Sequence, residues 1–580
     1  MPFSLGHYVG RYCTPENLAE LPASDPIAEL SATELDAAAP QAAPEAARML
    51  RCLNAKMQRG GAPLKVVMFG TSVTAGNRCN ARHGTNYPQL LAQLLSRRYP
   101  AANVTLSVYS YPGASPVFMR SCLGTLLPQA EADADLLVVE MTDNLAKSAA
   151  GAGMELELIL SALRRRSPRA AVLLLAPVDQ TCVRGLKRMK PFQHVPATRD
   201  GTRQVLARCY GNATPAQAFE AIAGAHGLAH VSQRHALRDR LFGAPDDATR
   251  LIGKLVHDQA HPGRRGHLQL AVALEHAIVR HAAPAPSLRS APTTAAAMTT
   301  TTTTRGADGR PATSSALDHA QCAEEPLAAP PWREASNVFA PRRESDDRAG
   351  DQVCALGRAI DPFVTRADGW SFVVERSKQG LPKPGYVATA AGASLDLCFK
   401  PRQPPDDALE RAACKDGSNG GRRGGGGGGC GGRGGEGDGE GDARVASLQY
   451  AWSLSYLMSY AHMGRVRGEC VRGGACSCGE RIFDAHWKRQ VSVPHVSRLM
   501  LKYRYKRGGS GGNGGGGGGA GGWVARGAAE RGCPCTIRLT VLNGTSSGEN
   551  KFKLVALMSG FYTGTIVGDA VTWAANFGIM

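Results

Sequence analysis

The sequence has no uninterrupted apolar stretch long enough to span a bilayer, so it predicts no integral membrane span. It also lacks a basic helix with interleaved aromatic residues. Much of its arginine lies in glycine-rich or polar segments, so the formal net charge of +18 does not indicate a nucleic-acid partner. No Gly-Lys-Ser/Thr follows a glycine-rich turn, which excludes a phosphate-binding loop. We therefore expect a protein that needs no cofactor.

The N-terminus, MPFSLGHYVGRYCTPENL, lacks the basic region and apolar core of a secretory leader. Sixteen cysteines, nine of them after residue 350, are nevertheless many for a cytosolic protein. Glycosylation sequons begin at Asn103, Asn212 and Asn543. We therefore expect a glycoprotein of the secretory pathway, the extracellular space or the cell wall. The mid-domain character of GHYVGRYC favours a true start upstream of this one.

Composition divides the 580 residues into two domains joined by a linker. In the first, apolar runs such as LKVVMF and DLLVVEM alternate with helix-length segments, which predicts βαβ units and a parallel sheet. In the second, strand-like runs without a long helix predict an all-β sandwich. The predicted ranges are 1–60 (helical or irregular), 61–283 (α/β), 284–345 (Pro/Thr/Ala-rich linker), 346–558 (β-rich, with glycine-rich insertions at 416–442 and 508–522) and 559–580 (unassigned).

Reactive residue types follow the predicted strands of the first domain, and one further group precedes its last helix. Ser72 ends the first strand, Gly113 follows the second and Asn144 the third, while Asp258 and His261 lie in HDQAHPG. The carboxyl ends of parallel strands meet at one edge of a sheet, which is where such folds bind ligands. The order therefore predicts one site built from all five residues.

The five residue types match the needs of acyl transfer. A serine hydroxyl requires a base, and a neutral imidazole such as that of His261 suits this role. Asp258, three residues earlier, can hold the other ring nitrogen and fix its tautomer. The backbone N–H groups of Ser72 and Gly113 and the side-chain amide of Asn144 can stabilise an oxyanion, where losing one donor typically reduces the rate by about 10²–10³.

These blocks, in this order over residues 64–282, resemble those of the SGNH, or GDSL-type, hydrolases. The resemblance implies a three-layer α/β/α, flavodoxin-like domain with a Ser72–His261–Asp258 triad. The family's Gly-Asp-Ser is Gly70-Thr71-Ser72 here, and its Gly-x-Asn-Asp is replaced by TDN at 142–144. SLSYLMSYAHMGRVRGEC, in the second domain, is similar to the β-rich domain of two-domain plant and green-algal relatives.

Each of these residues also has a structural interpretation. Ser72 could cap a helix, Asn144 could form a turn, Asp258 could cap the last helix, and His261 could be a loop histidine, as we expect His267 to be. We favour the catalytic hypothesis because the residues occur in one order at one predicted sheet edge.

Cysteines cluster in the second domain, in CVRGGACSC and CPC. Cys-x-Cys pairs match a zinc ribbon less well than paired Cys-x₂-Cys, so we expect disulfides and no metal site. The cysteines concerned are Cys470, Cys476, Cys478, Cys533 and Cys535.

Aromatic residues in the predicted strands of the second domain allow two interpretations. They could form a surface on which sugar rings stack, or they could belong to the core, which is the more frequent place for strand aromatics. The residues are Trp370, Tyr386, Trp452, Tyr456 and Tyr460.

Taken together, the sequence predicts a serine esterase of SGNH type. Its expected partner is an acylated small molecule or carbohydrate, with O-acetylated wall polysaccharide as one candidate. Acyl transfer to a sugar hydroxyl is an alternative, because water and sugar compete for the same acyl-enzyme. A second alternative is a non-catalytic protein in which a degenerate SGNH domain and the β-rich domain bind polysaccharide.

Overall fold

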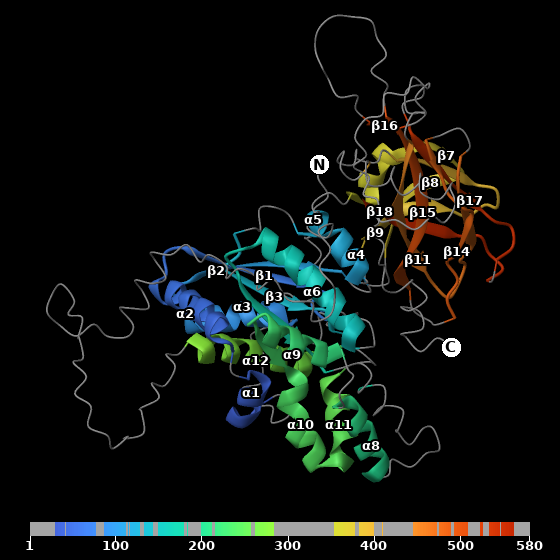
Figure 1. Cartoon of the computed structure of the whole chain (residues 1–580). Helices are drawn as coiled ribbons and strands as arrows, with labels where there is room; N and C mark the ends of the chain where they lie inside the picture. The colour runs from blue at the N-terminus through green and yellow to red at the C-terminus, as the bar shows by residue number, and fades with distance from the viewer. Residues whose placement is uncertain are drawn as a thin grey trace, which may run out of the picture. The chain divides into compact units, whose positions relative to one another are not determined.

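The structure is a computed structural model, and its described residues fall into two compact units (Figure 1). The predicted linker and both glycine-rich insertions lie outside the described residues. Each unit is treated by itself below. The residues described are 29–40, 42–76, 86–111, 114, 116–127, 133–142, 149–178, 183, 199–210, 215–256, 261–282, 353–376, 382–399, 409, 445–471, 475–488, 492–507, 523–525, 533–545 and 547–561.

The first unit is built on a five-stranded parallel sheet in the order β2-β1-β3-β4-β5. The β1 strand lies inside the sheet, with a partner on each side. Its β-branched and apolar residues are nearly all buried, as expected for a strand covered on both faces. The strands are β1 (Pro63–Gly70), β2 (Asn103–Ser110), β3 (Leu136–Glu140), β4 (Ala171–Ala176) and β5 (Ala229–Ser232).

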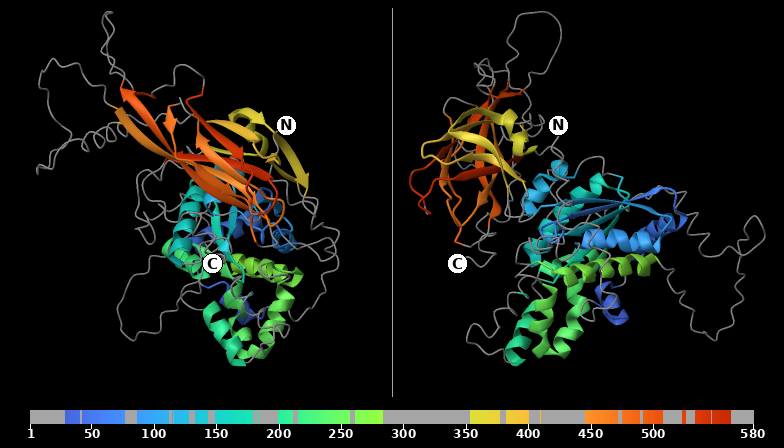
Figure 2. Two further views of the ribbon diagram at one scale, coloured as in Figure 1. Left: turned by 90° about the vertical axis from the view of Figure 1, so that its right-hand side faces the viewer. Right: turned by 180° about the vertical axis from the view of Figure 1, so that it is seen from behind.

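Helices cover both faces of this sheet (Figure 2). One face packs on α2 (Pro44–Arg59), α3 (Tyr87–Arg98) and α12 (Arg264–Ala282), which share a core with Val66 and Met68. On the other face, α9 (Pro215–Ala225) contacts β4, β5 and α6 (Ala149–Arg166). The predicted three-layer α/β/α class is confirmed. No described helix has both the length and the apolar character needed to cross a membrane.

The unit contains helices that the sequence analysis placed elsewhere or did not identify. The helices α1 (Ala32–Ala38) and α2 pack into the same core, although we assigned residues 1–60 to a separate segment. Two short helices, α4 (Pro116–Ser121) and α5 (Leu123–Leu126), follow β2. A small helical cluster joins α8 (Arg199–Cys209), α10 (Gln233–Gly243) and α11 (Pro245–Leu255) around their own apolar contacts.

The second unit is an antiparallel sandwich, and the predicted all-β class is confirmed. One sheet has the order β14-β12-β17-β10-β7, and the other has β13-β15-β11-β18-β9-β8, with β6 and β16 paired at its side. Side chains from both sheets form one apolar core. The elements are β6 (Val353–Leu356), η7 (Gly357–Phe363), β7 (Val364–Asp368), β8 (Trp370–Arg376), β9 (Pro382–Ala388), β10 (Ser394–Phe399), β11 (Val445–Met458), β12 (Arg465–Cys470), β13 (Cys476–Ser477), β14 (Arg481–Asp484), β15 (Val493–Arg507), β16 (Trp523–Ala525), β17 (Cys535–Val541) and β18 (Phe552–Phe561). Because β18 continues to Phe561, the sandwich extends past the predicted boundary at 558.

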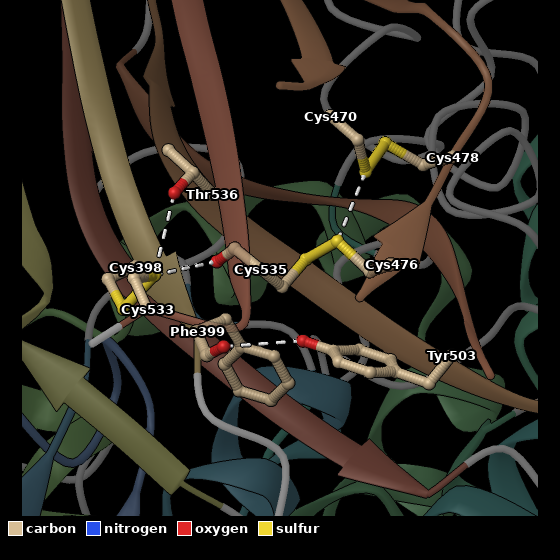
Figure 3. Close-up of a disulfide and its surroundings, with 9 residues drawn as sticks. All are labelled: Cys398, Phe399, Cys470, Cys476, Cys478, Tyr503, Cys533, Cys535 and Thr536. Carbon is tan, nitrogen blue, oxygen red and sulfur yellow. Dashed lines mark hydrogen bonds between the residues drawn. A yellow bond between two sulfur atoms is a disulfide. The ribbon is translucent and has the colours of Figure 1, made fainter. Parts of the chain in front are cut away.

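The late cysteines form disulfides, as predicted. Figure 3 shows Cys398–Cys533, Cys470–Cys478 and Cys476–Cys535, and the sulfurs of Cys470 and Cys476 lie 3.8 Å apart. A metal ion would need these sulfurs as thiolates, whereas here they are bonded to one another. The disulfide-bonded cysteines elsewhere are Cys52, Cys122, Cys209 and Cys354.

The aromatic residues proposed as a sugar-stacking surface belong mainly to the sandwich core. The relative exposures of Trp370, Tyr386, Trp452 and Tyr456 are 5%, 8%, 2% and 3%, whereas that of Tyr460 is 43%. Tyr456 stacks on Phe552 rather than facing solvent. A stacking platform built from these five residues is therefore wrong, because four of them are needed to fill the space between the sheets.

Loop closure predicts different contributions from two of the disulfides. Replacing Cys398 and Cys533, which are 135 positions apart, by serine should lower the free energy of unfolding of the sandwich by about 4 kcal/mol. Replacing Cys470 and Cys478, 8 apart, should lower it by about 2.5 kcal/mol. Urea titrations followed by tryptophan fluorescence report on the sandwich, because every described tryptophan lies in it. Equal losses would contradict the loop-length argument.

Candidate functional site

The turn after β1 is shaped by a glycine that has no room for a side chain. A Cβ at Gly70 would lie 2.0 Å from Oγ1 of Thr74 and 2.6 Å from the carbonyl oxygen of Glu140. The turn is closed by the N–H of Ala75, which donates to the carbonyl of Thr71 at 2.9 Å. The chain therefore folds back tightly over the end of β1, and Ser72 lies within this turn.

The Ser72 hydroxyl is paired with the predicted histidine. Its Oγ lies 2.9 Å from Nε2 of His261, which is 189 positions later in the chain. Ser72 is 7% exposed, so the pair is largely shielded from solvent. A capping serine would accept a backbone N–H with its hydroxyl oxygen, but among the described residues the partner of this hydroxyl is the imidazole.

His261 is positioned by the chain that joins α11 to α12. Val256 and Pro262 form an antiparallel bridge, and the N–H of Gly263 donates to the carbonyl of Leu255 at 2.8 Å. In the first turn of α12, a Cβ at Gly266 would lie 2.4 Å from that same carbonyl oxygen. Backbone contacts on both sides thus fix the segment that carries the imidazole.

Three predicted site residues, Asp258, Gly113 and Asn144, lie outside the described residues, so their roles remain predictions. The strands that lead to the last two are described. The last residues of β2 and β3 are both in register with the last residue of β1. The chain therefore leaves all three strands at the same level of the sheet.

The backbone N–H of Ser72 is available as a donor. The neighbouring N–H groups of Thr71 and Thr74 donate to the Glu140 carboxylate, and that of Gly76 donates to Val73. Within the described part of the chain, no acceptor takes the N–H of Ser72. A free amide beside a nucleophile is what an oxyanion hole requires.

A buried polar network behind this turn was missed by the sequence analysis. The carboxylate of Glu140, at the end of β3, accepts hydrogen bonds from Thr71 and Thr74, and Oγ1 of Thr74 lies 2.7 Å from the hydroxyl of Tyr87. Burial raises the pKa of Glu140, while its hydrogen bonds oppose that shift. Burial, together with the Glu140 charge, holds the pKa of Tyr87 well above its usual value.

His267 is not the loop residue that we expected. It lies within α12, is fully buried, and its Nδ1 accepts the N–H of Tyr87 at 3.4 Å. Burial, and next the nearby His261, lower the pKa of His267 to about 3. The ring is therefore neutral at physiological pH, which keeps Nδ1 free to accept.

Comparisons with known proteins found distant structural similarity. No protein-family model and no curated protein matches the chain. A two-domain esterase active on acetylated mannans is similar over 91% of this chain and 99% of its own, at 12% identity and a TM-score of 0.49. An acetylxylan esterase from Geobacillus stearothermophilus covers 38% of this chain and 94% of its own, at 18% identity and a TM-score of 0.25. For a lipase/acylhydrolase from Enterococcus faecalis the values are 37%, 95%, 16% and 0.25. At such values the matches assign no activity to this chain.

The topology itself defines the class of the first unit. It is a parallel α/β domain with an SGNH hydrolase-like fold, in which a serine follows the first strand and a histidine precedes the last helix. These two side chains meet at the carboxyl edge of the sheet.

The buried imidazole of His267 predicts how the stability of the α/β unit depends on pH. Below pH 6.5 the unfolded chain takes up a proton that the folded chain refuses down to about pH 3. The free energy of unfolding should therefore fall by about 1.4 kcal/mol per pH unit in this window. His267→Asn, whose Oδ1 can replace Nδ1 as the acceptor, should remove about 2 kcal/mol of the loss between pH 7 and pH 5. Urea titrations followed by circular dichroism would measure this, and equal slopes for both proteins would contradict it.

Proposed function

We propose that this protein is a serine esterase that hydrolyses acyl esters, with Ser72 as nucleophile and His261 as general base. The observation that carries the proposal is the 2.9 Å hydrogen bond between Ser72 Oγ and His261 Nε2. A serine hydroxyl is a weak nucleophile until a base accepts its proton, and an imidazole at hydrogen-bond distance is suited to do so.

In the proposed reaction, Ser72 Oγ attacks the ester carbonyl while its proton passes to Nε2 of His261. The tetrahedral intermediate collapses to an acyl-enzyme, and the imidazolium returns the proton to the leaving alcohol. Water then attacks the acyl group, with His261 again as base, and releases the acid and free Ser72. The histidine ends each cycle in its starting protonation state.

The remaining roles belong to the same proposal. The free N–H of Ser72 stabilises the oxyanion, together with the N–H of Gly113 and the side-chain amide of Asn144. Asp258 holds the second ring nitrogen of His261 and so fixes the imidazole for proton transfer. Support for Gly113 and Asn144 comes from the common level at which β1, β2 and β3 end.

For the substrate, we propose O-acyl esters of carbohydrates in an oxidising, extracytoplasmic compartment. The disulfides in both units support the compartment, since such bonds persist where thiols are not kept reduced. Exposed positions for Asn103 and Asn543 leave these two sequons accessible. The non-catalytic, sugar-binding alternative loses its aromatic platform, because those side chains fill the core.

Covalent labelling of the serine tests the proposal. A fluorophosphonate probe should label the native protein, and Ser72→Ala should abolish both labelling and turnover of a short acyl ester. His261→Gln should reduce kcat by about 10⁴-fold, as is typical when a triad loses its base.

Matched controls come from the same helices. Ser96→Ala on α3 and His276→Gln on α12 remove the same functional groups away from Ser72, and should leave labelling and turnover within twofold. A native, folded protein that neither reacts with the probe nor turns over acyl esters would refute the proposed function.

A further inference from the structure

We propose that Glu140 is the positioning residue of this site, holding the Ser72 turn in place through Thr71 and Thr74. This inference rests on the proposed function and assigns a role to a residue that does not touch the reacting atoms. It concerns how Ser72 is held, since a nucleophile displaced by about 1 Å can lose about 10²-fold in rate.

One carboxylate oxygen of Glu140 collects four donors from the turn. Its Oε2 accepts the N–H of Thr71 at 3.2 Å and the N–H of Thr74 at 3.2 Å. The same oxygen accepts from the Thr71 hydroxyl at 3.2 Å and the Thr74 hydroxyl at 2.9 Å. These threonines directly precede Ser72 and follow it by two positions. The carboxylate therefore fixes the backbone on both sides of the nucleophile.

This arrangement holds Ser72 without using the groups that the reaction needs. Its hydroxyl remains with His261, and its N–H has no acceptor within the described part of the chain. Among the described residues, the side-chain partners of the Glu140 carboxylate are Thr71 and Thr74 alone. The carboxylate therefore competes for neither the hydroxyl nor the amide of Ser72.

Burial makes the contact rigid and selective. Glu140, Thr71 and Thr74 are each 0% exposed, so water cannot replace the carboxylate as acceptor. An unpaired buried N–H is destabilising by about 1–3 kcal/mol, and the turn presents two of them at this point. Without an acceptor here, the turn has to move to satisfy those amides, and Ser72 moves with it.

The network also reaches the helix that begins just after His261. The Thr74 hydroxyl contacts the hydroxyl of Tyr87, whose backbone N–H donates to His267 of α12. Glu140 is thereby connected to both partners of the Ser72–His261 pair. The carboxylate that the family pattern has at position 71 is absent here, and β3 supplies one to the same turn.

Variants at position 140 separate an acceptor from mere bulk. Glu140→Leu removes every acceptor and should lower kcat about 100-fold, with KM within threefold, because the shift affects Ser72 rather than substrate contacts. Glu140→Gln keeps one oxygen and should retain kcat within about tenfold. The matched control is Glu157→Leu on α6, which removes a buried carboxylate paired with His226 but lies in another network. It should keep kcat within threefold.

Equal kcat values for the two leucine variants would overturn the proposal, as would a glutamine variant no better than leucine at position 140. If Glu140→Leu does not fold, Thr74→Val decides. It removes one hydroxyl donor but keeps the N–H, and it should lower kcat about tenfold, whereas a change below twofold contradicts the role.

Amide exchange distinguishes this inference from the proposed function. If the native protein neither labels nor turns over ester, the function fails, and hydrogen exchange of the peptide spanning residues 71–74 then tests the contact itself. Faster exchange in Glu140→Gln than in Glu157→Gln supports the holding role. Equal exchange refutes it.

Discussion

The level at which three parallel strands end is the constraint on which the rest of the α/β unit depends. Backbone hydrogen bonds set Gly70 opposite Ser110 on one side and opposite Glu140 on the other. A shift of one residue would turn each side chain to the other face of the sheet. It would also remove the carboxylate from beneath the turn. The sheet register therefore sets the chemistry as much as the identity of the serine does.

The second partner of the pair is brought by helix packing. The α12 helix lies against α2 and α3 on one face of the sheet, and its first turn is tied to the end of α11 by backbone contacts. The hydrogen bond between Ser72 and His261 thus joins two rigid supports rather than two mobile loops. Such a pair is organised before substrate arrives, which reduces the entropy lost on reaching the transition state.

Much of the fold was predictable because apolar runs and helix-length segments alternate so regularly. Ser72 and His261 could be paired from the sequence, since strand order alone brings them to one edge. Glu140 could not, because in LLVVE it looks like the polar end of a strand, and only the fold shows two threonines converging on it. The available signal was a carboxylate closing a strand that is otherwise wholly apolar.

The aromatic residues of the sandwich show the opposite limit. In Trp452 and Tyr456 the even spacing places two rings on one face of β11, but alternation does not say which face is covered. The second sheet decides that, and it buries both. Disulfide formation was likewise predictable from cysteine clustering, whereas the pairing of Cys398 with Cys533 depends on strand neighbours far apart in sequence.

Two residues without any functional group share control of the site. Gly70 and Gly266 each lie where a methyl group would collide with backbone, one beneath the serine turn and one beneath the histidine segment. In a mutational scan, alanine at either position would imitate the loss of a reactive side chain. The tolerance map of this enzyme-like edge therefore includes positions that contribute only empty space, and a sequence variant that fills that space disables the pair while leaving Ser72 and His261 intact.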